Sequence, residues 1–269
     1  FSPAKFMRQL GYETFFYYGG HMSWHDVGNF AKNNFFQNIV GGEKMSADFG
    51  QVEWGVRDAE LFDFILAQQR DTASFNLILT VSNHPPFDVD LEKEGCPNPL
   101  SDPHDRKLQH HWYADKEIGR FIDSILKKYP DAIVIVTGDH AARIYPKELE
   151  FTARMSNLVP LLIAGELATR SELPRTIGAI SWMDAIPTLI DLCAPQGFEY
   201  AAWGHSLLSK DKPAQAPKNP WGIFYDDQFH TLGSAAPSAQ DRELVRAYIA
   251  LAYWCTRQGP LLPDPQAVK

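Results

Sequence analysis

Cysteine, basic charge and long apolar runs are all scarce in this sequence. Its only cysteines, Cys96, Cys193 and Cys255, are too few and odd in number for a disulfide framework. Because 25 Lys and Arg face 33 Asp and Glu, the net charge is −8. No basic stripe occurs, which argues against a nucleic-acid-binding protein. No apolar run reaches the roughly 18 residues of a membrane span, and no signal peptide is visible.

The remaining composition is that of an ordinary globular protein. Hydrophobic residues make up 45% of the 269 residues and charged residues 22%, which allows a substantial core. The length suits one large α/β domain or two small ones. No internal repeat or low-complexity tract occurs. Since the sequence begins at Phe1 without a Met, we interpret it as a fragment or a trimmed form.

Short apolar runs alternate with helical patterns along the chain. The periodicity predicts strands at 14–18, 75–81, 133–137, 159–164 and 222–225, and helices at 58–69, 107–128, 184–193 and 238–256. We expect Asp184 to cap one helix, and Ser238 with Asp241 to form a capping box on the last. The β-branched run at 133–136 is typical of a strand buried on both faces.

This alternation predicts an α/β fold with a mostly parallel central sheet and helices on both faces. We expect residues 1–208 to form one catalytic domain. Residues 209–220 are rich in Lys, Pro and Ala and read as a surface linker. The late strand and the C-terminal helix within 209–269 are expected to pack on the same domain.

In such sheets, ligands bind beyond the carboxyl ends of the strands. Asp139 and His140 directly follow the strand at 133–137. Their oxygen and nitrogen atoms suit Zn, Mn or Fe. The alternative is a helix N-cap aspartate followed by a histidine that faces solvent. Arg143, three residues beyond His140, is either a second contact for an anion or a surface arginine.

Two further strand ends carry candidate residues. His84 follows the strand at 75–81 and precedes a stiff Pro-Pro turn. It is either a donor to a phosphate or leaving group or a loop histidine bonded to the backbone. Trp24 follows the strand at 14–18 and the pair Gly19-Gly20, which permits close approach of a ligand. It either stacks on a substrate or packs in the core.

An ordered series of motifs resembles the catalytic domain of lipoteichoic acid synthases and related phosphoglycerol transferases, within the alkaline phosphatase and sulfatase superfamily. The matching stretches run from about residue 10 to 208 in family order. They are Gly11-Tyr12-Glu13-Thr14, Tyr18-Gly19-Gly20, Trp54-Gly55-Val56-Arg57-Asp58, Ser82-Asn83-His84-Pro85-Pro86-Phe87, Tyr113-Ala114-Asp115, Ile118-Gly119-Arg120-Phe121, Gly138-Asp139-His140, Val159-Pro160-Leu161-Leu162-Ile163 and Asp184-Ala185-Ile186-Pro187-Thr188-Leu189.

The resemblance implies a single divalent metal, with manganese expected ahead of zinc, magnesium or calcium. In the family, a Glu, a nucleophilic Thr and an Asp-His pair hold this metal. Asp139 and His140 match the pair, His84 matches a histidine that contacts the substrate phosphate, and the region around Trp24 matches the headgroup loop. The Glu and the Thr belong to a first strand and a nucleophile helix that we expect to precede Phe1.

The resemblance therefore implies a metal-dependent transferase acting through a covalent intermediate. It would move phosphoglycerol or a similar headgroup from a phospholipid to a glycan or lipid acceptor. The implied location is extracytoplasmic, at the periplasmic or outer face of a membrane, with anchoring segments outside this chain. Without the nucleophile, the chain alone is expected to be inactive. The family places an arginine after its tryptophan, whereas His25 and Asp26 follow Trp24 here.

Two alternatives remain open. The first is a sulfatase or a phosphodiesterase-type hydrolase of the same superfamily, acting on a sulfate or phosphate ester. Sulfatases mature a cysteine within a Cys-x-Pro/Ala-x-Arg motif, and the stretch from Cys193 to Gly197 starts this motif but ends in glycine. The second alternative is a non-catalytic binding module that keeps the fold. The residues before Phe1 would decide between them.

Overall fold

The structure is a computed structural model. It describes residues 2–46, 53–68, 72–97, 103–141, 158–170, 173, 181–202, 204–209, 218–219, 222–225, 228–231 and 238–258. Arg143, a candidate anion contact, lies outside the described residues.

A parallel three-stranded sheet forms the centre of the fold. The strand β1 (Glu13–Tyr18) lies between β2 (Asn38–Gly41) and β3 (Ser74–Leu79), and it is parallel to both. The predicted strands at 14–18 and 75–81 are therefore confirmed, and β2 is an addition. β3 ends at Leu79 and not at Val81 as predicted, because the N–H of Val81 donates to the side chain of Asp58 and not to a neighbouring strand.

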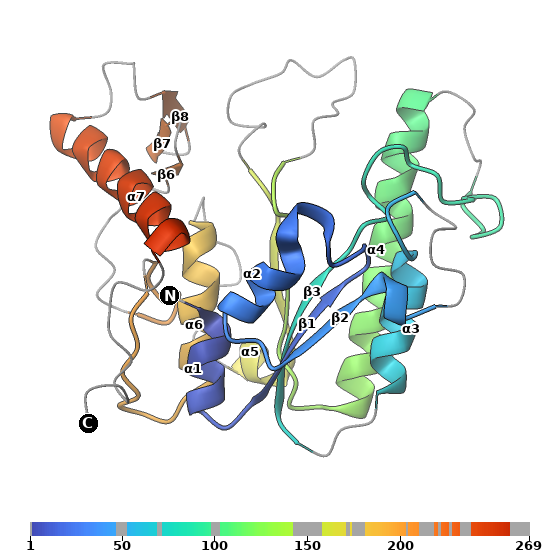
Figure 1. The fold of residues 1–269 in the computed structure, drawn as a ribbon, viewed down its shortest axis with the longest axis horizontal. Coiled ribbons are helices and arrows are strands. Elements are labelled where there is room, and N and C mark those ends of the chain that lie inside the picture. The colour runs from blue at the N-terminus through green and yellow to red at the C-terminus, as the bar shows by residue number, and fades with distance from the viewer. Residues whose placement is uncertain are drawn as a thin grey trace.

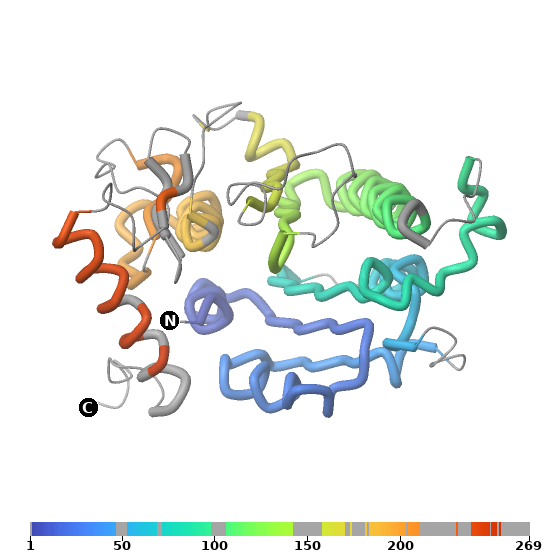
Figure 2. The backbone as a smooth tube through the Cα atoms, turned by 90° about the horizontal axis from the view of Figure 1, so that it is seen from above, coloured from blue at the N-terminus to red at the C-terminus, as the bar shows by residue number. Residues whose placement is uncertain are grey.

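Side chains of β1 alternate between two hydrophobic clusters, one on each face of the sheet. Phe16 and Tyr18 pack with α1 (Pro3–Gln9), α2 (Val27–Asn33) and α6 (Ala185–Cys193). Phe15 and Tyr17 pack with α3 (Asp58–Ala67) and α4 (Pro103–Lys128). In Figures 1 and 2, α3 and α4 lie side by side, as do α1 and α6. The predicted α/β fold with helices on both faces is confirmed.

The third predicted strand, at 133–137, pairs differently from expectation. β4 (Val134–Thr137) is antiparallel to β5 (Leu161–Ala164) and forms a separate two-stranded sheet in the described part of the chain. Its side chains are half-buried, and Thr137 is exposed. Ile133 and Ile135 pack on the cluster that contains Phe16. The prediction of a strand buried on both faces is wrong, because the β-branched run follows from strand propensity without requiring cover on the second face.

Asp184 occupies the position before α6 but does not cap it. It is the last residue of the 3-10 turn η4 (Trp182–Asp184), and its backbone is already helical, with φ −79° and ψ −18°. An N-cap residue normally has an extended backbone that turns its side chain toward the helix N–H groups. Instead, the carboxylate of Asp184 accepts the N–H of Ser181 at 3.1 Å and the N–H of His205 at 2.8 Å.

The C-terminal part contains a small antiparallel sheet and a long helix. β6 (Lys218–Asn219), β7 (Gly222–Tyr225) and β8 (Gln228–Thr231) precede α7 (Ala239–Gln258). The expected capping box is confirmed, since Asp241 accepts the N–H of Ser238 at 3.2 Å and Ser238 Oγ accepts the N–H of Asp241 at 3.1 Å. Most of the predicted linker at 209–220 lies outside the described residues. None of the described helices combines the length and apolar character that crossing a bilayer requires.

Burial predicts that Leu61 stabilises the fold strongly. Leu61 of α3 has no exposed surface and lies in the cluster shared with Phe15 and Tyr17. We expect Leu61→Ala to lower the free energy of unfolding by about 2–5 kcal/mol, because it removes a buried side chain and leaves a cavity. Urea denaturation measures this change. Phe30→Ala is the control, because Phe30 is 58% exposed and its loss should cost no more than about 0.5 kcal/mol.

Candidate functional site at the carboxyl edge of the sheet

The carboxyl ends of β1, β2 and β3 meet at one edge of the sheet, because the three strands are parallel. Figure 1 shows that β4 also ends on this side, the upper one in the view. The segments that follow these strands carry Trp24, Glu43, His84 and the pair Asp139-His140. The sequence-predicted residues that the structure describes therefore follow strands that end on one side of the molecule.

Two glycines allow the chain to pack closely at this edge. A Cβ on Gly55 would lie 2.0 Å from the carbonyl oxygen of Gly19, and Gly55 has a φ of +147°. A Cβ on Gly20 would meet the ring of Tyr18 at 2.5 Å. With no side chain in the way, the N–H of Val56 donates to the carbonyl of Gly19 at 2.9 Å. The segment from Trp54 to Asp58 is thereby joined to the end of β1.

Aromatic rings form a continuous group across this edge. The ring of Trp54 lies 5.2 Å from that of Trp24 and 4.1 Å from that of His84, measured between centroids. Trp24 also lies 6.2 Å from the ring of Tyr18. Trp24 remains 40% exposed, which is more than a core tryptophan shows. It therefore offers an aromatic surface next to Trp54, the ring that contacts His84.

The imidazole of His84 has a defined orientation. Its Nδ1 lies 2.7 Å from the carbonyl oxygen of Pro85, and a carbonyl only accepts, so Nδ1 carries a hydrogen. The N–H of His84 donates to the carbonyl of Val81 at 3.1 Å. Because the side chain is exposed, Nε2 is the atom that can meet a ligand. The backbone bond expected of a loop histidine is therefore present, and the role of His84 as a donor to a phosphate or leaving group stays a prediction.

Asp139 and His140 lie next to each other beyond β4. Asp139 Oδ1 is 3.8 Å from His140 Nε2, and the two side chains are 72% and 62% exposed. His140 Nδ1 lies 3.0 Å from the carbonyl oxygen of Ala141. A histidine that ligates a metal usually donates its other ring N–H to such an acceptor. Asp139 Oδ1 also accepts the backbone N–H of His140 at 2.9 Å, and no helix is described directly after it.

The chemistry of this pair fits part of a metal site. A carboxylate oxygen and an imidazole nitrogen are both ligands for Mn and Zn. Within the described residues, no group of three or more His, Cys, Asp or Glu side chains could hold a metal ion. Asp139 and His140 therefore fit as two ligands of a set and do not make a complete site by themselves.

Besides Glu43, two residues that contact the loop after β3 had no role in the sequence analysis. Trp54 joins Trp24 to His84, and it stands in the quoted motif Trp54-Gly55-Val56-Arg57-Asp58, so the motif was its signal. His111 of α4 lies 2.9 Å from the Asn83 side chain through Nδ1. The contact between His111 and Asn83 joins α4 to the loop after β3. No local sequence pattern predicts it.

Next to His111, the side chain of His110 is completely buried. Its Nδ1 lies 2.7 Å from the carbonyl oxygen of Arg106, and its buried Nε2 has no hydrogen-bond partner among the described residues. Burial lowers the pKa of His110, because the imidazolium form loses its hydration. Burial lowers the pKa of His111 as well. We therefore expect the folded protein to hold both rings neutral below the pH at which they protonate when unfolded.

This pKa shift predicts a pH-dependent stability. Near pH 7 the His110 ring is neutral in both the folded and the unfolded protein. As the pH falls below about 6.5, His110 binds a proton in the unfolded protein before it does so in the folded protein. The free energy of unfolding should therefore decrease as the pH falls from that value toward the lowered pKa of His110. His110→Phe should make this decrease shallower, as measured by urea denaturation across pH. His205→Ala, at an exposed histidine beyond α6, should leave it unchanged; an unaltered slope in His110→Phe would contradict the assignment.

The chain has the fold of a solved protein from the alkaline phosphatase superfamily. A protein of the alkaline phosphatase superfamily from Vibrio parahaemolyticus superposes with a TM-score of 0.70 at 22% identity, covering 95% of this chain and 68% of that one. The lipoteichoic acid synthase LtaP from Listeria monocytogenes superposes with a TM-score of 0.71 at 15% identity, covering 94% of this chain and 72% of that one.

The chain belongs to the sulfatase family, whose model matches residues 4–194. A lipoteichoic acid synthase from Staphylococcus saprophyticus is 26% identical over 184 residues, which cover 61% of this chain and 27% of that protein. The chain thus spans about a quarter of the length of this curated relative. The resemblance to lipoteichoic acid synthases and phosphoglycerol transferases, inferred from the motifs, is confirmed at the level of the family.

Proposed function

We propose that this chain is part of the catalytic domain of a metal-dependent phosphoryl-group transferase, whose nucleophile lies outside the chain. It moves phosphoglycerol or a similar headgroup from a phospholipid to a glycan or lipid acceptor, at the extracytoplasmic side of a membrane. The observation that carries the proposal is the grouping of His84, Trp54 and Trp24 at the carboxyl edge of the sheet, where α/β enzymes bind their ligands. The similarity to a lipoteichoic acid synthase supports the choice of substrate class.

His84 and the two tryptophans have separate roles in this proposal. With a proton on Nε2, His84 donates to a phosphoryl oxygen or to the oxygen of the leaving group as the bond to phosphorus breaks. Trp54 holds the imidazole by ring contact. Trp24, with its exposed ring, covers the apolar part of the headgroup and excludes water from it. No hydroxyl of the described residues is assigned as the nucleophile.

Asp139 and His140 are the proposed ligands of a divalent cation, with manganese preferred over zinc, magnesium and calcium. A bound cation supplies positive charge to the phosphoryl oxygens. Asp139 contributes the negative charge of the site and His140 a neutral nitrogen, whose orientation the contact with Ala141 supports. The proposal requires further ligands, because two side chains do not complete a coordination shell.

The loop after Trp24 suggests a headgroup that differs from that of the synthases. His25 and Asp26 have left-handed backbones, with φ of +44° and +61°, and the His25 ring lies 4.3 Å from the Trp24 ring. The Asp26 carboxylate accepts a hydrogen bond from Asn29 at 2.7 Å. The Asp26 carboxylate stands near the position where the synthases have an arginine. Its negative charge disfavours a headgroup that carries an anionic group in addition to its phosphate near Trp24. The proposal therefore includes neutral or cationic headgroups of similar size.

Product analysis of the whole protein tests this function. Vesicles containing phosphatidylglycerol and, separately, phosphatidylethanolamine are incubated with manganese and a glycan acceptor. Release of diacylglycerol together with a phosphoryl-linked headgroup on the acceptor is the expected result. Release of the free headgroup phosphate would establish a hydrolase instead, and cleavage of an aryl sulfate alone would establish a sulfatase. Binding of glycerol phosphate without any turnover would support the binding module.

A further inference from the structure

A buried carboxylate lies directly behind the loop that carries His84. Asp58, the first residue of α3, has no exposed surface. Its Oδ1 accepts the N–H of Ser82 at 3.1 Å and the N–H of Val81 at 3.3 Å. In return, Ser82 Oγ accepts the backbone N–H of Asp58 at 2.8 Å. The start of α3 and the chain leaving β3 are thus joined by hydrogen bonds in both directions.

These hydrogen bonds are connected to His84 through the backbone of Val81. Val81, whose N–H is held by Asp58, accepts the N–H of His84 on its carbonyl at 3.1 Å. The segment that precedes Asp58 runs beside the same loop. Trp54 contacts the His84 ring, and the N–H of Glu53 donates to the side chain of Asp88 at 2.8 Å. The loop is therefore held on both sides of His84 by the one segment that ends in Asp58.

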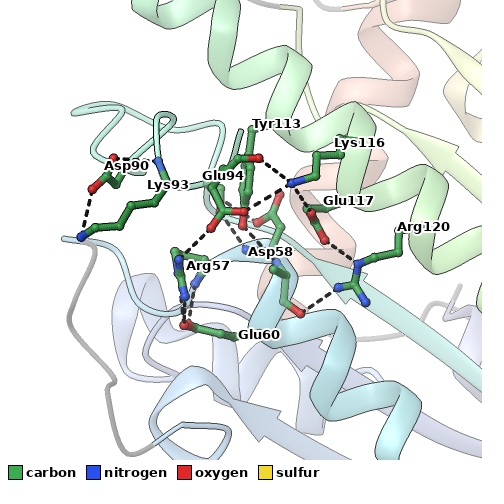
Figure 3. Close-up of polar contacts among 12 residues, drawn as sticks. Arg57, Asp58, Glu60, Asp90, Lys93, Glu94, Tyr113, Lys116, Glu117 and Arg120 are labelled. Atoms are coloured by element: carbon green, nitrogen blue, oxygen red, sulfur yellow. Dashed lines mark hydrogen bonds and ion pairs between the residues drawn. The ribbon is translucent and has the colours of Figure 1, made fainter. Parts of the chain in front are cut away.

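The cations around Asp58 are paired with other carboxylates. Figure 3 shows Arg57 bridging Glu60 and Glu94, with contacts of 2.6 and 2.8 Å, and Lys116 joining Glu94 to Glu117. No ion pair to Asp58 is found among the described residues, and its Oδ2 has no hydrogen-bond partner there. Burial also raises the pKa of Asp58. A carboxyl group in this setting acts as an acceptor for backbone N–H groups rather than as one half of an ion pair.

We propose that Asp58 is a positioning residue: it holds the backbone of Val81 and Ser82 so that His84 presents Nε2 at the carboxyl edge of the sheet. This inference rests on the role given to His84 in the proposed function. It extends that function to a residue that touches neither substrate nor metal. Because the contact uses an acceptor oxygen, a neutral acceptor of the same shape preserves it, and a side chain without an acceptor abolishes it.

The test compares Asp58→Ala and Asp58→Asn by affinity for glycerol phosphate, read from tryptophan fluorescence with manganese present. We expect Asp58→Ala to weaken binding by about 10- to 100-fold, the effect of losing a charged hydrogen bond from His84. Asp58→Asn should stay within about threefold of the parent, because its amide oxygen accepts the same two N–H groups. Glu117→Ala is the matched control: Glu117 is 3% exposed and pairs with Arg120, so its loss should lower stability and leave the affinity unchanged.

A double-mutant cycle separates positioning from a general loss of structure. If Asp58 acts through His84, the pair of substitutions Asp58→Ala and His84→Ala should bind no more weakly than His84→Ala alone. Losses of affinity that add in the double mutant would overturn the proposal. So would a folded Asp58→Ala with the affinity of the parent, or Asp58→Asn binding as weakly as Asp58→Ala. Should Asp58→Ala not fold, Ser82→Ala removes the reciprocal bond and should weaken binding several-fold in the same His84-dependent way. If His84→Ala itself leaves the affinity unchanged, the role given to His84 in the proposed function fails, and the positioning role of Asp58 fails with it.

Discussion

Replacing His84 with alanine should lower the turnover of the whole protein by about 10²- to 10⁴-fold, the range expected for loss of a group that transfers a proton or stabilises a developing charge. In the isolated chain, the same substitution should weaken glycerol phosphate binding by roughly tenfold or more. The reason is geometric. The contact of Nδ1 with the carbonyl of Pro85 leaves Nε2 as the atom that meets the ligand.

The result must distinguish loss of chemistry from loss of fold. His84 is exposed. The free energy of unfolding of His84→Ala should therefore differ from that of the parent by no more than about 0.5 kcal/mol, the usual range of surface substitutions. His205→Ala is the matched control, an exposed histidine beyond α6, and should keep full affinity. Parental turnover in His84→Ala would remove His84 from the reaction. Metal loss in that variant would instead make His84 a ligand.

In the whole protein, Asp139→Ala should abolish stoichiometric metal binding. Asp139 supplies the only carboxylate of the proposed Asp139-His140 pair, and removing a ligand should weaken affinity by at least the roughly 10- to 100-fold seen when groups that merely orient ligands are lost. Measuring manganese and zinc by elemental analysis after dialysis tests this expectation. His140→Ala should behave in the same way, because the imidazole is the only nitrogen ligand of the proposed pair.

The control for this experiment lies at the opposite end of the same strand. Asp131 is an exposed aspartate just before β4, so Asp131→Ala removes one surface charge without reaching the carboxyl edge. It should retain the metal content of the parent. Metal content that stays the same in Asp139→Ala would refute the metal assignment, while the family membership and the fold would stand.

Most of the fold could be predicted because local patterns report local structure. The continuous run of buried residues in β1 and the helical spacing of apolar residues in α3 and α4 correspond to the two clusters that the sheet separates. The capping box of Ser238 and Asp241 was visible because its partners are three residues apart. Asp184 looked like a cap for the same reason, but its carboxylate bonds to His205, 21 residues away, and no local rule anticipates that partner.

The site divides in the same way. The sequence alone determined that Trp24, His84, Asp139 and His140 lie in the segments that follow predicted strands. Only the tertiary structure decided how His84 is held. Trp54 packs on its ring, and Asp58 binds the backbone behind it from 24 residues away at Ser82. Such contacts depend on how the start of α3 packs against the end of β3 in the folded protein. The local order of residues in the sequence does not specify that packing.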